Sequence, residues 1–310
     1  MLEVKNASYS YGDVKAVNNI SFTIEPGEIF GLLGSNGSGK TTTFRMIMGL
    51  LEPEAGEVKY FNRIVSYSDV NEIGYMIEER SLLQKLTVEK LVHFFGGLKD
   101  LDKETIDRRL DFWLERFEIT DYKKRKVSEL SKGNQQKIQF ITAIINNPKL
   151  LVLDEPFSGL DIINTKMFVE VINDFKAQGS MIVFSSHQID DVEAFCEKVL
   201  VLDKGEAILN GKIKDIKTEF QKKNIKLIAD GINQEKLEAI KGVYEVVKRA
   251  DLYEVKIENA DVAMDVFNYV KTLPNVIRFD VEEAKLSDIF IETMKERKIN
   301  NKEVLTNEEV

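Results

Sequence analysis

The fold is decided by one short glycine-rich stretch, Gly34-Ser35-Asn36-Gly37-Ser38-Gly39-Lys40-Thr41. It matches the pattern G-x-x-x-x-G-K-[ST], in which glycines let the backbone curl until successive N–H groups point at phosphate oxygens. Lys40 would then reach the β- and γ-phosphates, and the Thr41 hydroxyl would bind Mg²⁺. We therefore predict a phosphate cradle over residues 34–41, with Thr42 also at the nucleotide. The cradle alone leaves an ATPase, a GTPase and a small-molecule kinase open.

The residues around the cradle have the pattern of an α/β fold. A nearly continuous apolar run, Glu28 to Leu33, predicts a buried parallel strand before the cradle, and a helix is expected over Thr41 to Leu50. Residues 2–24 alternate apolar and polar positions, which predicts antiparallel strands. Further buried strands are expected at Leu150 to Leu153, Met181 to Phe184 and Val199 to Leu202, separated by helices.

Two adjacent acids, Asp154 and Glu155, end one of these apolar strands. Burying charge at such a place is costly without a cation nearby. We therefore assign Asp154 to Mg²⁺, and Glu155 to orienting and deprotonating an attacking water. The alternative is that both acids only cap the next loop.

The composition is that of an ordinary folded protein, with 310 residues, 43% hydrophobic and 31% charged. The net charge of -9 does not favour nucleic acid as a partner, so a phosphate site has to be local. The first residues lack the pattern of a secretion signal, and the apolar runs are too short to cross a bilayer. Any channel would therefore belong to another chain. The single cysteine, Cys196, excludes an intrachain disulfide and reads as a small buried hydrophobe.

The pattern changes twice along the chain. Helical spacing over about residues 80–148 predicts a helical insertion, with helices at Thr87 to Leu98, Lys103 to Phe117 and Ser131 to Asn146. From about Ile225, strands and helices alternate again, so we expect an α+β accessory domain over residues 221–297, reached through the lysine-rich segment Lys212 to Lys223. The first domain is expected to span residues 1–220, and residues 298–310 are expected to be disordered.

Over roughly residues 1–220 the chain resembles the nucleotide-binding subunit of ABC transporters. Leu130-Ser131-Lys132-Gly133-Asn134-Gln135-Gln136 resembles the signature sequence of that family, Ser158-Gly159-Leu160-Asp161 its D-loop, and Ser186-His187 its switch histidine. The resemblance implies a P-loop NTPase fold of the ABC type, with a mixed sheet core, an N-terminal antiparallel β subdomain and a helical insertion. It also implies an ATPase that binds ATP and Mg²⁺.

The resemblance gives several residues a role. Tyr11 looks like the aromatic that stacks on adenine, although an ordinary strand tyrosine is the alternative. Ser131 and Gly133 match the residues that bind the γ-phosphate of ATP held by another protomer, with Asp161 beside them. His187 resembles the residue that senses the γ-phosphate. His93 has no such support, and we interpret it as structural.

The chain departs from the family pattern at three places. The signature contains Lys132 and Asn134 where the family has glycine and glutamine, which puts the strength of the phosphate contact in doubt. Glu78 stands at the expected glutamine of the Q-loop, where a carboxylate could still approach Mg²⁺ and couple ATP occupancy to a transmembrane partner. Phe157 replaces a small polar residue.

These variants and the C-terminal extension are most similar to the bacterial sodium-extrusion and multidrug-exporter types. The resemblance then implies an exporter subunit that forms a homodimer, docks on a separate transmembrane permease and lies at the cytoplasmic face of the membrane. The extension is expected to be a regulatory or dimer-stabilising module. A soluble ABC ATPase without a transport role and a catalytically weakened nucleotide-binding scaffold are the alternatives.

Overall fold

The computed structural model describes residues 1–77 and 83–307. The chain divides into two compact units, Met1–Gly211 and Lys212–Val310. The division lies before the expected boundary at residue 220, because the lysine-rich segment forms a helix, α7, that contacts the last helix of the second unit.

The first unit contains two sheets and the helices that pack on them. Its elements in chain order are β1 (Leu2–Tyr11), β2 (Val14–Ile24), β3 (Ile29–Gly34), α1 (Lys40–Ile47), β4 (Ala55–Tyr60), β5 (Arg63–Ile64), η1 (Tyr67–Glu72), β6 (Ile73–Met76), α2 (Val88–Gly97), α3 (Lys103–Arg116), η2 (Thr120–Tyr122), η3 (Val127–Glu129), α4 (Lys132–Ile144), β7 (Leu150–Asp154), α5 (Ile162–Ala177), β8 (Met181–Ser186), α6 (Ile189–Phe195), β9 (Lys198–Asp203) and β10 (Glu206–Lys212, which begins in this unit).

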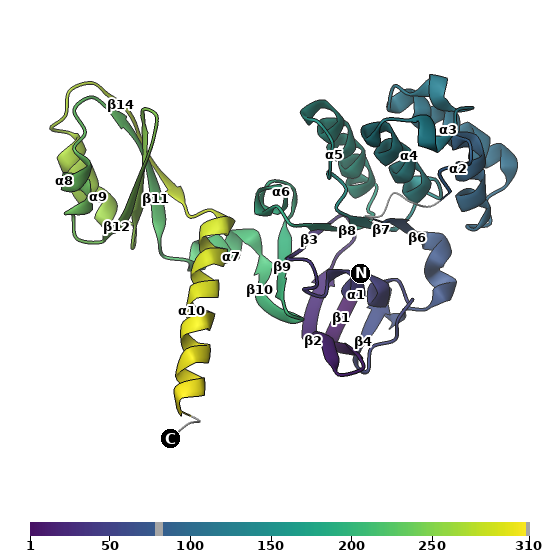
Figure 1. Cartoon of the computed structure of the whole chain (residues 1–310), viewed down its shortest axis with the longest axis horizontal. Helices are drawn as coiled ribbons and strands as arrows, with labels where there is room; N and C mark the ends of the chain where they lie inside the picture. The colour runs from purple at the N-terminus through teal and green to yellow at the C-terminus, as the bar shows by residue number, and fades with distance from the viewer. Residues whose placement is uncertain (78–82, 308–310) are drawn as a thin grey trace. The chain divides into compact units, whose positions relative to one another are not determined.

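The larger sheet has the strand order β10-β9-β3-β8-β7-β6, and the strands from β9 to β6 pair in parallel. Every residue of β3, β7 and β8 is buried, as expected for strands covered on both faces. Helices α4, α5 and α6 lie on one face, while α1 and the sheet β2-β1-β4-β5 lie on the other (Figure 1). The predicted mixed α/β fold is therefore confirmed, with its main core between the two sheets.

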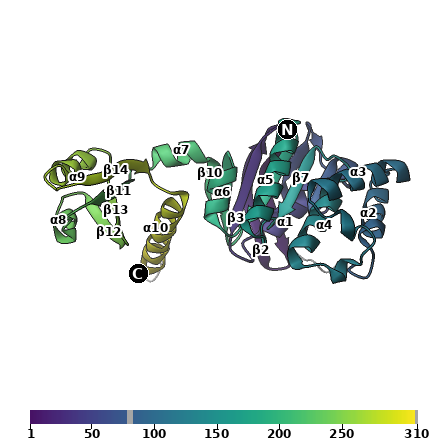
Figure 2. The same cartoon turned by 90° about the horizontal axis from the view of Figure 1, so that it is seen from above.

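The predicted helical insertion is present as α2, α3 and α4, which group together at one end of this unit (Figure 2). Side chains that precede each helix cap it: Thr87 accepts a hydrogen bond from Lys90 N, and Asp102 accepts one from Thr105 N. His93 on α2 lies 2.7 Å from Asp107 Oδ1 on α3. This contact joins two helices, which agrees with the structural interpretation of His93.

The second unit is an α+β unit with a four-stranded antiparallel sheet in the order β12-β13-β11-β14. Its elements are α7 (Ile213–Glu219), β11 (Lys223–Ala229), α8 (Gln234–Glu238), β12 (Val243–Arg249), β13 (Leu252–Ile257), α9 (Val262–Val270), β14 (Val276–Glu283) and α10 (Leu286–Asn307). Alternate residues of β11 and β13 form a core with Leu237 of α8 and Val266 of α9. The other face of the sheet carries Asn224 and Lys256, which contact Asp288 of α10.

Helix α10 continues to Asn307, whereas the sequence predicts a disordered tail from residue 298. No glycine or proline interrupts the segment, so the backbone can stay helical. Within residues 1–77 and 83–307, no helix combines the length and the apolar composition that a membrane span requires.

Candidate functional site: a phosphate cradle beside two carboxylates

The cradle between β3 and α1 needs glycine at two positions. At Gly34, a Cβ atom would lie 2.5 Å from the carbonyl oxygen of Leu202. At Gly39 the backbone has a φ of 110°, and a Cβ atom would lie 2.5 Å from the carbonyl oxygen of Ala16. A side chain at either position would force the neighbouring backbone to move, so both positions require glycine. The loop therefore turns tightly enough for α1 to begin at Lys40.

Lys40 is buried at the centre of this loop. Its Nζ donates hydrogen bonds to the carbonyl oxygens of Gly34, at 2.7 Å, and Ser35, at 3.1 Å. An ammonium group has three donors, so one remains for a ligand. In the described part of the chain, the buried hydroxyl of Ser38 has no hydrogen-bond partner. A buried cation and an unsatisfied hydroxyl in one loop are suited to an anionic ligand rich in oxygen atoms.

The threonines after Lys40 differ in exposure. Thr41 is exposed in the first turn of α1, while Thr42 and Thr43 are buried, and the Thr43 hydroxyl donates to the carbonyl oxygen of Gly39. Of the three, Thr41 is thus the one that presents its hydroxyl to the surface at the start of the helix.

The sheet register brings the two carboxylates to the same edge as the cradle. Leu33 of β3 pairs with Ser186 of β8, and Ser185 of β8 pairs with Asp154 of β7. The strands are parallel, so their carboxyl ends share one edge, and two strand spacings separate β3 from β7, about 10 Å. The predicted juxtaposition of the cradle with Asp154 is consistent with this register.

Ser185 holds Asp154 and Glu155 together. Its hydroxyl donates to Asp154 Oδ1 at 2.5 Å and accepts from the backbone N–H of Glu155 at 3.0 Å. All three residues are buried. Sequence reasoning missed Ser185 because it ended the strand at Phe184, whereas β8 continues through two serines whose polar groups find partners at the sheet edge.

Glu155 and His187 form a second contact at this edge. Glu155 has a positive φ of 50°, and its Oε2 lies 2.8 Å from His187 Nδ1. The carboxylate side chain is only 8% exposed, whereas the imidazole is 57% exposed. The pair therefore combines a buried base with an accessible ring, an arrangement that can orient a water molecule for attack on a bound phosphate.

Tyr11 lies at the end of β1 and is 44% exposed. Its hydroxyl accepts a hydrogen bond from Arg45 Nη1 of α1, and its ring meets Tyr9 edge-on at 5.0 Å. Arg45, which sequence reasoning also missed, thus connects this aromatic to the helix that follows the cradle.

The signature residues and Asp161 lie at exposed helix N-termini. Ser131 caps α4 and accepts a hydrogen bond from Asn134 N, and Gly133 lies in the first turn. Asp161 caps α5 and accepts from Asn164 N at 2.8 Å. Helix N-termini attract anions, so the start of α4 can bind phosphate from outside the chain.

Two side chains connect the segment that follows Asp154 and Glu155 to neighbouring elements. The buried amide of Gln136, one turn into α4, donates to the carbonyl oxygen of Pro156 at 3.1 Å.

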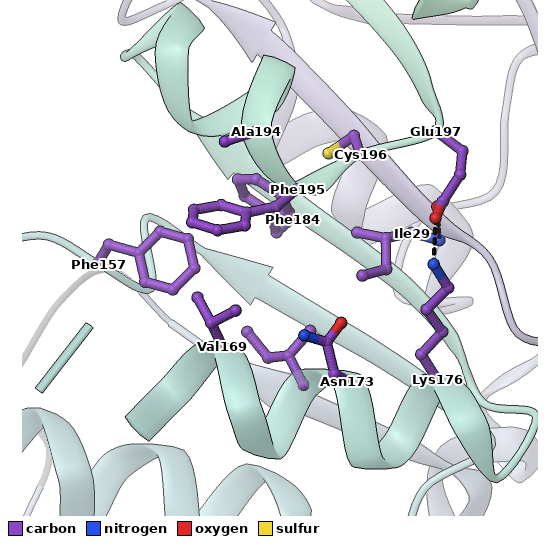
Figure 3. A pocket seen from close by; sticks show the side chains of 11 residues that line it. Ile29, Phe157, Val169, Asn173, Lys176, Phe184, Ala194, Phe195, Cys196 and Glu197 are labelled. Carbon is purple, nitrogen blue, oxygen red and sulfur yellow. Dashed lines mark hydrogen bonds and ion pairs between the residues drawn. The ribbon is translucent and has the colours of Figure 1, made fainter. Parts of the chain in front are cut away.

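Phe157 points its ring at Phe184 of β8 and Phe195 of α6, at centroid distances of 5.7 and 5.3 Å (Figure 3). These rings line a cavity of about 230 Å³, and Cys196 lies on its wall. Burial raises the pKa of the Cys196 thiol, in keeping with a packing role.

Glu78, the acid expected at the Q-loop position, lies outside the described residues. The last described residue before it, Ile77, accepts a hydrogen bond from the amide of Gln139 on α4.

Comparison with known proteins gives one consistent result. A profile of the family described as "ABC transporter" matches residues 17–158, and one described as "ATP-binding protein DrrA1-3-like, C-terminal domain" matches residues 211–294. The ABC transporter ATP-binding protein YhaQ of Bacillus subtilis is 43% identical over 292 residues, which cover 94% of this chain and 98% of YhaQ. The ABC transporter ATP-binding protein NatA of the same organism is 38% identical over 207 residues, covering 66% and 84% of the two chains.

Solved structures agree with these sequence relatives. An ATP-binding subunit of an ABC transporter superimposes with a TM-score of 0.66 at 30% identity, covering 71% of this chain and 93% of that subunit. The dimeric bacterial ABC transporter cassette MJ0796 superimposes with a TM-score of 0.62 at 26% identity, covering 69% and 99%.

Proposed function

Because this chain belongs to the family of ABC transporter ATP-binding proteins, we propose that it uses the cradle and the Asp154–Glu155 pair to hydrolyse ATP and so powers a separate transmembrane permease. The observation that carries the proposal is the hydrogen-bonded row Asp154, Ser185, Glu155 and His187. This row lies at the sheet edge where β3 leads into the cradle.

The residues at this edge fit ATP together with Mg²⁺. The free donor of Lys40 and the unsatisfied Ser38 hydroxyl suit phosphate oxygens. The Thr41 hydroxyl and the Asp154 carboxylate are oxygen ligands of the kind that Mg²⁺ prefers. When bound, Mg²⁺ would neutralise charge that develops on the transferred phosphoryl group.

Glu155 is the group that we assign to the attacking water. Its buried carboxylate would accept the proton of that water, while His187, on the exposed side, holds the same carboxylate in place and would contact the γ-phosphate. Lys40 contributes a positive charge that stabilises the phosphate oxygens without moving far, because two carbonyl groups already orient it.

We propose further that two copies hold two ATP molecules between them. Ser131 and Gly133, at the exposed start of α4, would bind the γ-phosphate of the nucleotide in the opposite copy, with Asp161 beside it. Lys132 adds a positive charge next to that phosphate. The permease would dock beside the helical insertion and Glu78 at the cytoplasmic face of the membrane. We propose export as the direction of transport, because the sequence variants and the C-terminal extension resemble those of exporter subunits.

The alternative of a weakened scaffold is countered by the geometry of Glu155. A protein that only binds nucleotide has no need for a buried carboxylate in a left-handed backbone conformation, at hydrogen-bond distance from a histidine.

The substitution E155Q tests the proposal. We expect a loss of turnover of at least about 10²-fold, because the general base is removed. ATP binding measured by calorimetry should be retained, and dimers should accumulate with ATP in light scattering. The matched control is E170Q, an exposed glutamate on α5, which should behave as wild type. Unchanged turnover in E155Q, or no nucleotide uptake by the wild type, would refute the assignment.

A further inference from the structure

The outer edge of β14 combines an exposed strand edge with exposed apolar side chains. β14 is the last strand in the order β12-β13-β11-β14, and within the described residues no strand pairs with its outer side. Val276 is 41% exposed, Ile277 67% and Val281 43%. An apolar strand edge of this kind tends to pair with another strand.

Phe279 and Val281 of β14 share one face, whereas a register shift between Arg278 and Val276 interrupts the alternation at Ile277. Phe279 pairs with Leu227 and Val281 with Ile225, and both partners face the helices α8 and α9. The Phe279 ring meets Phe267 of α9 at 5.3 Å. Phe267 is 41% exposed and Met264, one turn earlier on α9, is 60% exposed. An apolar surface therefore continues from the strand edge onto the helix.

The charges of β14 lie on the opposite face. Arg278 contacts Asp280 at 2.9 Å and Glu282 at 3.6 Å, and Glu282 also contacts Lys226 of β11 at 2.7 Å. The strand thus carries one base followed by two acids at alternate positions.

We propose that β14 pairs antiparallel with β14 of a second copy of this chain, on a two-fold axis through Phe279, to form one eight-stranded sheet. Phe279 then lies opposite Phe279 of the second copy, so apolar side chains meet on the helix face. On the other face Arg278 lies opposite Asp280 of the second copy. The two-fold axis repeats the Arg278–Asp280 pair.

Charge complementarity selects this register. An axis through Arg278 would place two arginines directly opposite each other, and an axis through Asp280 would oppose two aspartates. A shift by one residue would bring the apolar side chains of one copy onto the charged face of the other. The axis through Phe279 avoids all three conflicts.

The other edge of the same sheet is protected. β12 carries Lys248 and Arg249 at its exposed end and Glu245 near its start. Charged side chains on an edge strand discourage pairing with another chain. β14 carries charges as well, but it also exposes three aliphatic side chains, Val276, Ile277 and Val281, whereas the only large apolar side chain exposed on β12 within the described residues is Tyr244. β14 is therefore the edge with more apolar surface for association.

This contact needs no nucleotide, which separates it from the ATP-dependent pairing proposed above. The test uses the full chain in a buffer with EDTA and no nucleotide, with the dimer dissociation constant measured by sedimentation. The wild type should form dimers. R278D and D280R should each raise the dissociation constant by roughly tenfold to a hundredfold, because two attractive pairs become repulsive. K248D, on the β12 edge, is the matched control and should leave it unchanged.

Mixing the two single variants is the decisive step. In a mixed dimer each opposed pair again joins one acid to one base, so R278D and D280R together should associate nearly as strongly as the wild type. The Arg278–Asp280 contact within one chain is lost in both variants and cannot be restored by mixing. A monomeric wild type, dimers unaffected by either reversal, or a mixture that stays monomeric would each overturn the proposal. Turnover and ATP-dependent dimerisation of the same variants report separately on the first unit.

Discussion

Lys40 of the first unit and Lys256 of the second are held by different kinds of partner. In the first unit, Lys40 is buried and donates to two neutral carbonyl oxygens. In the second unit, Lys256 contacts the carboxylates of Glu245 and Asp288, and Lys222 contacts that of Glu292. A lysine held by dipoles keeps its charge available for an anion, whereas a lysine held by carboxylates is neutralised within the fold. The difference indicates that Lys40 is placed for a ligand, whereas Lys256 and Lys222 contribute to the stability of the second unit.

The largest effect is expected when one lysine from each unit is replaced, Lys40 in the first and Lys222 in the second. K40M should weaken ATP binding on the order of a hundredfold, because a charge-assisted contact to phosphate is lost. K222M removes an equivalent charge from the second unit, where Lys222 serves Glu292 and lies 4.9 Å from the Tyr244 ring. Its ATP affinity, measured by the same calorimetry, should equal that of the wild type. Equal losses in both variants would show that the comparison is wrong.

The next effect concerns two buried serines, Ser180 just before β8 and Ser185 near its carboxyl end. S185A removes the bridge between Asp154 and Glu155, so we expect turnover to fall roughly tenfold through misplacement of the base. S180A removes a hydrogen bond to the carbonyl oxygen of Pro148, far from the carboxylates along the strand. Both variants should unfold with a free energy lower by about 1–3 kcal/mol. Only S185A should lose turnover, and an equal loss in S180A would assign a merely structural role to Ser185.

A third effect concerns the pairing of charges in the second unit. Burial raises the pKa of Asp288, but hydrogen bonds from Asn224 and Lys256 outweigh it, so the net pKa lies below the usual value. The carboxylate therefore contributes stability above its unfolded pKa, and this contribution is lost as the pH falls through the folded pKa. D288N should destabilise the unit by about 1 kcal/mol at neutral pH, and the difference from wild type should vanish in acid.

Hydrogen exchange of the β11 and β13 amides in the full chain measures this loss. D251N, at the exposed turn between β12 and β13, is the control. If the stability difference between D288N and the wild type persists at acidic pH, the stabilising role assigned to the Asp288 carboxylate is wrong.

The smallest effect compares Lys256 with Lys99, a half-buried lysine of the first unit. Lys99 donates to the carbonyl oxygens of Val70 and Ile73, and burial lowers its pKa to about 8. For Lys256, burial lowers the pKa, but hydrogen bonds to Glu245 and Asp288 reverse the effect and raise it.

The two lysines should therefore give opposite pH trends. Between pH 8 and the unfolded pKa, the unfolded chain binds more protons than the folded chain at Lys99, so raising the pH stabilises the first unit. We expect about 1 kcal/mol between pH 8 and 10 relative to K99M, after screening by solvent. K103M, at an exposed site, should show no such trend. A stability difference between the wild type and K99M that does not change with pH would contradict the lowered pKa of Lys99.

The sequence predicted the features that are defined by residues close together along the chain. The cradle follows a buried strand and precedes a helix, so one stretch of residues defines it. Asp154 and Glu155 follow an apolar strand, which again is a local signal. The predicted strands and helices of the first unit are present with small shifts at their ends, whereas α10 of the second unit extends into the segment expected to be disordered.

The rest depends on contacts between distant residues. Ser185 meets Asp154 across 31 positions, and Gln136 meets Pro156 across 20, so neither pairing has a local pattern. The sequence predicts strands after about Ile225 but not which of them lies at the edge, because strand order is a property of the whole sheet. The boundary between the units moved for the same reason, since α7 contacts α10 far along the chain.

The left-handed backbone conformation of Glu155 lowers stability, while its carboxylate serves the reaction, so selection acts on both. A non-glycine residue at this φ costs about 1 kcal/mol relative to glycine. A random change to glycine would therefore relieve the main chain while it removes the carboxylate. Lineages that no longer need the reaction should drift readily toward glycine or asparagine at this position, so its identity in a relative would report whether that relative still turns over.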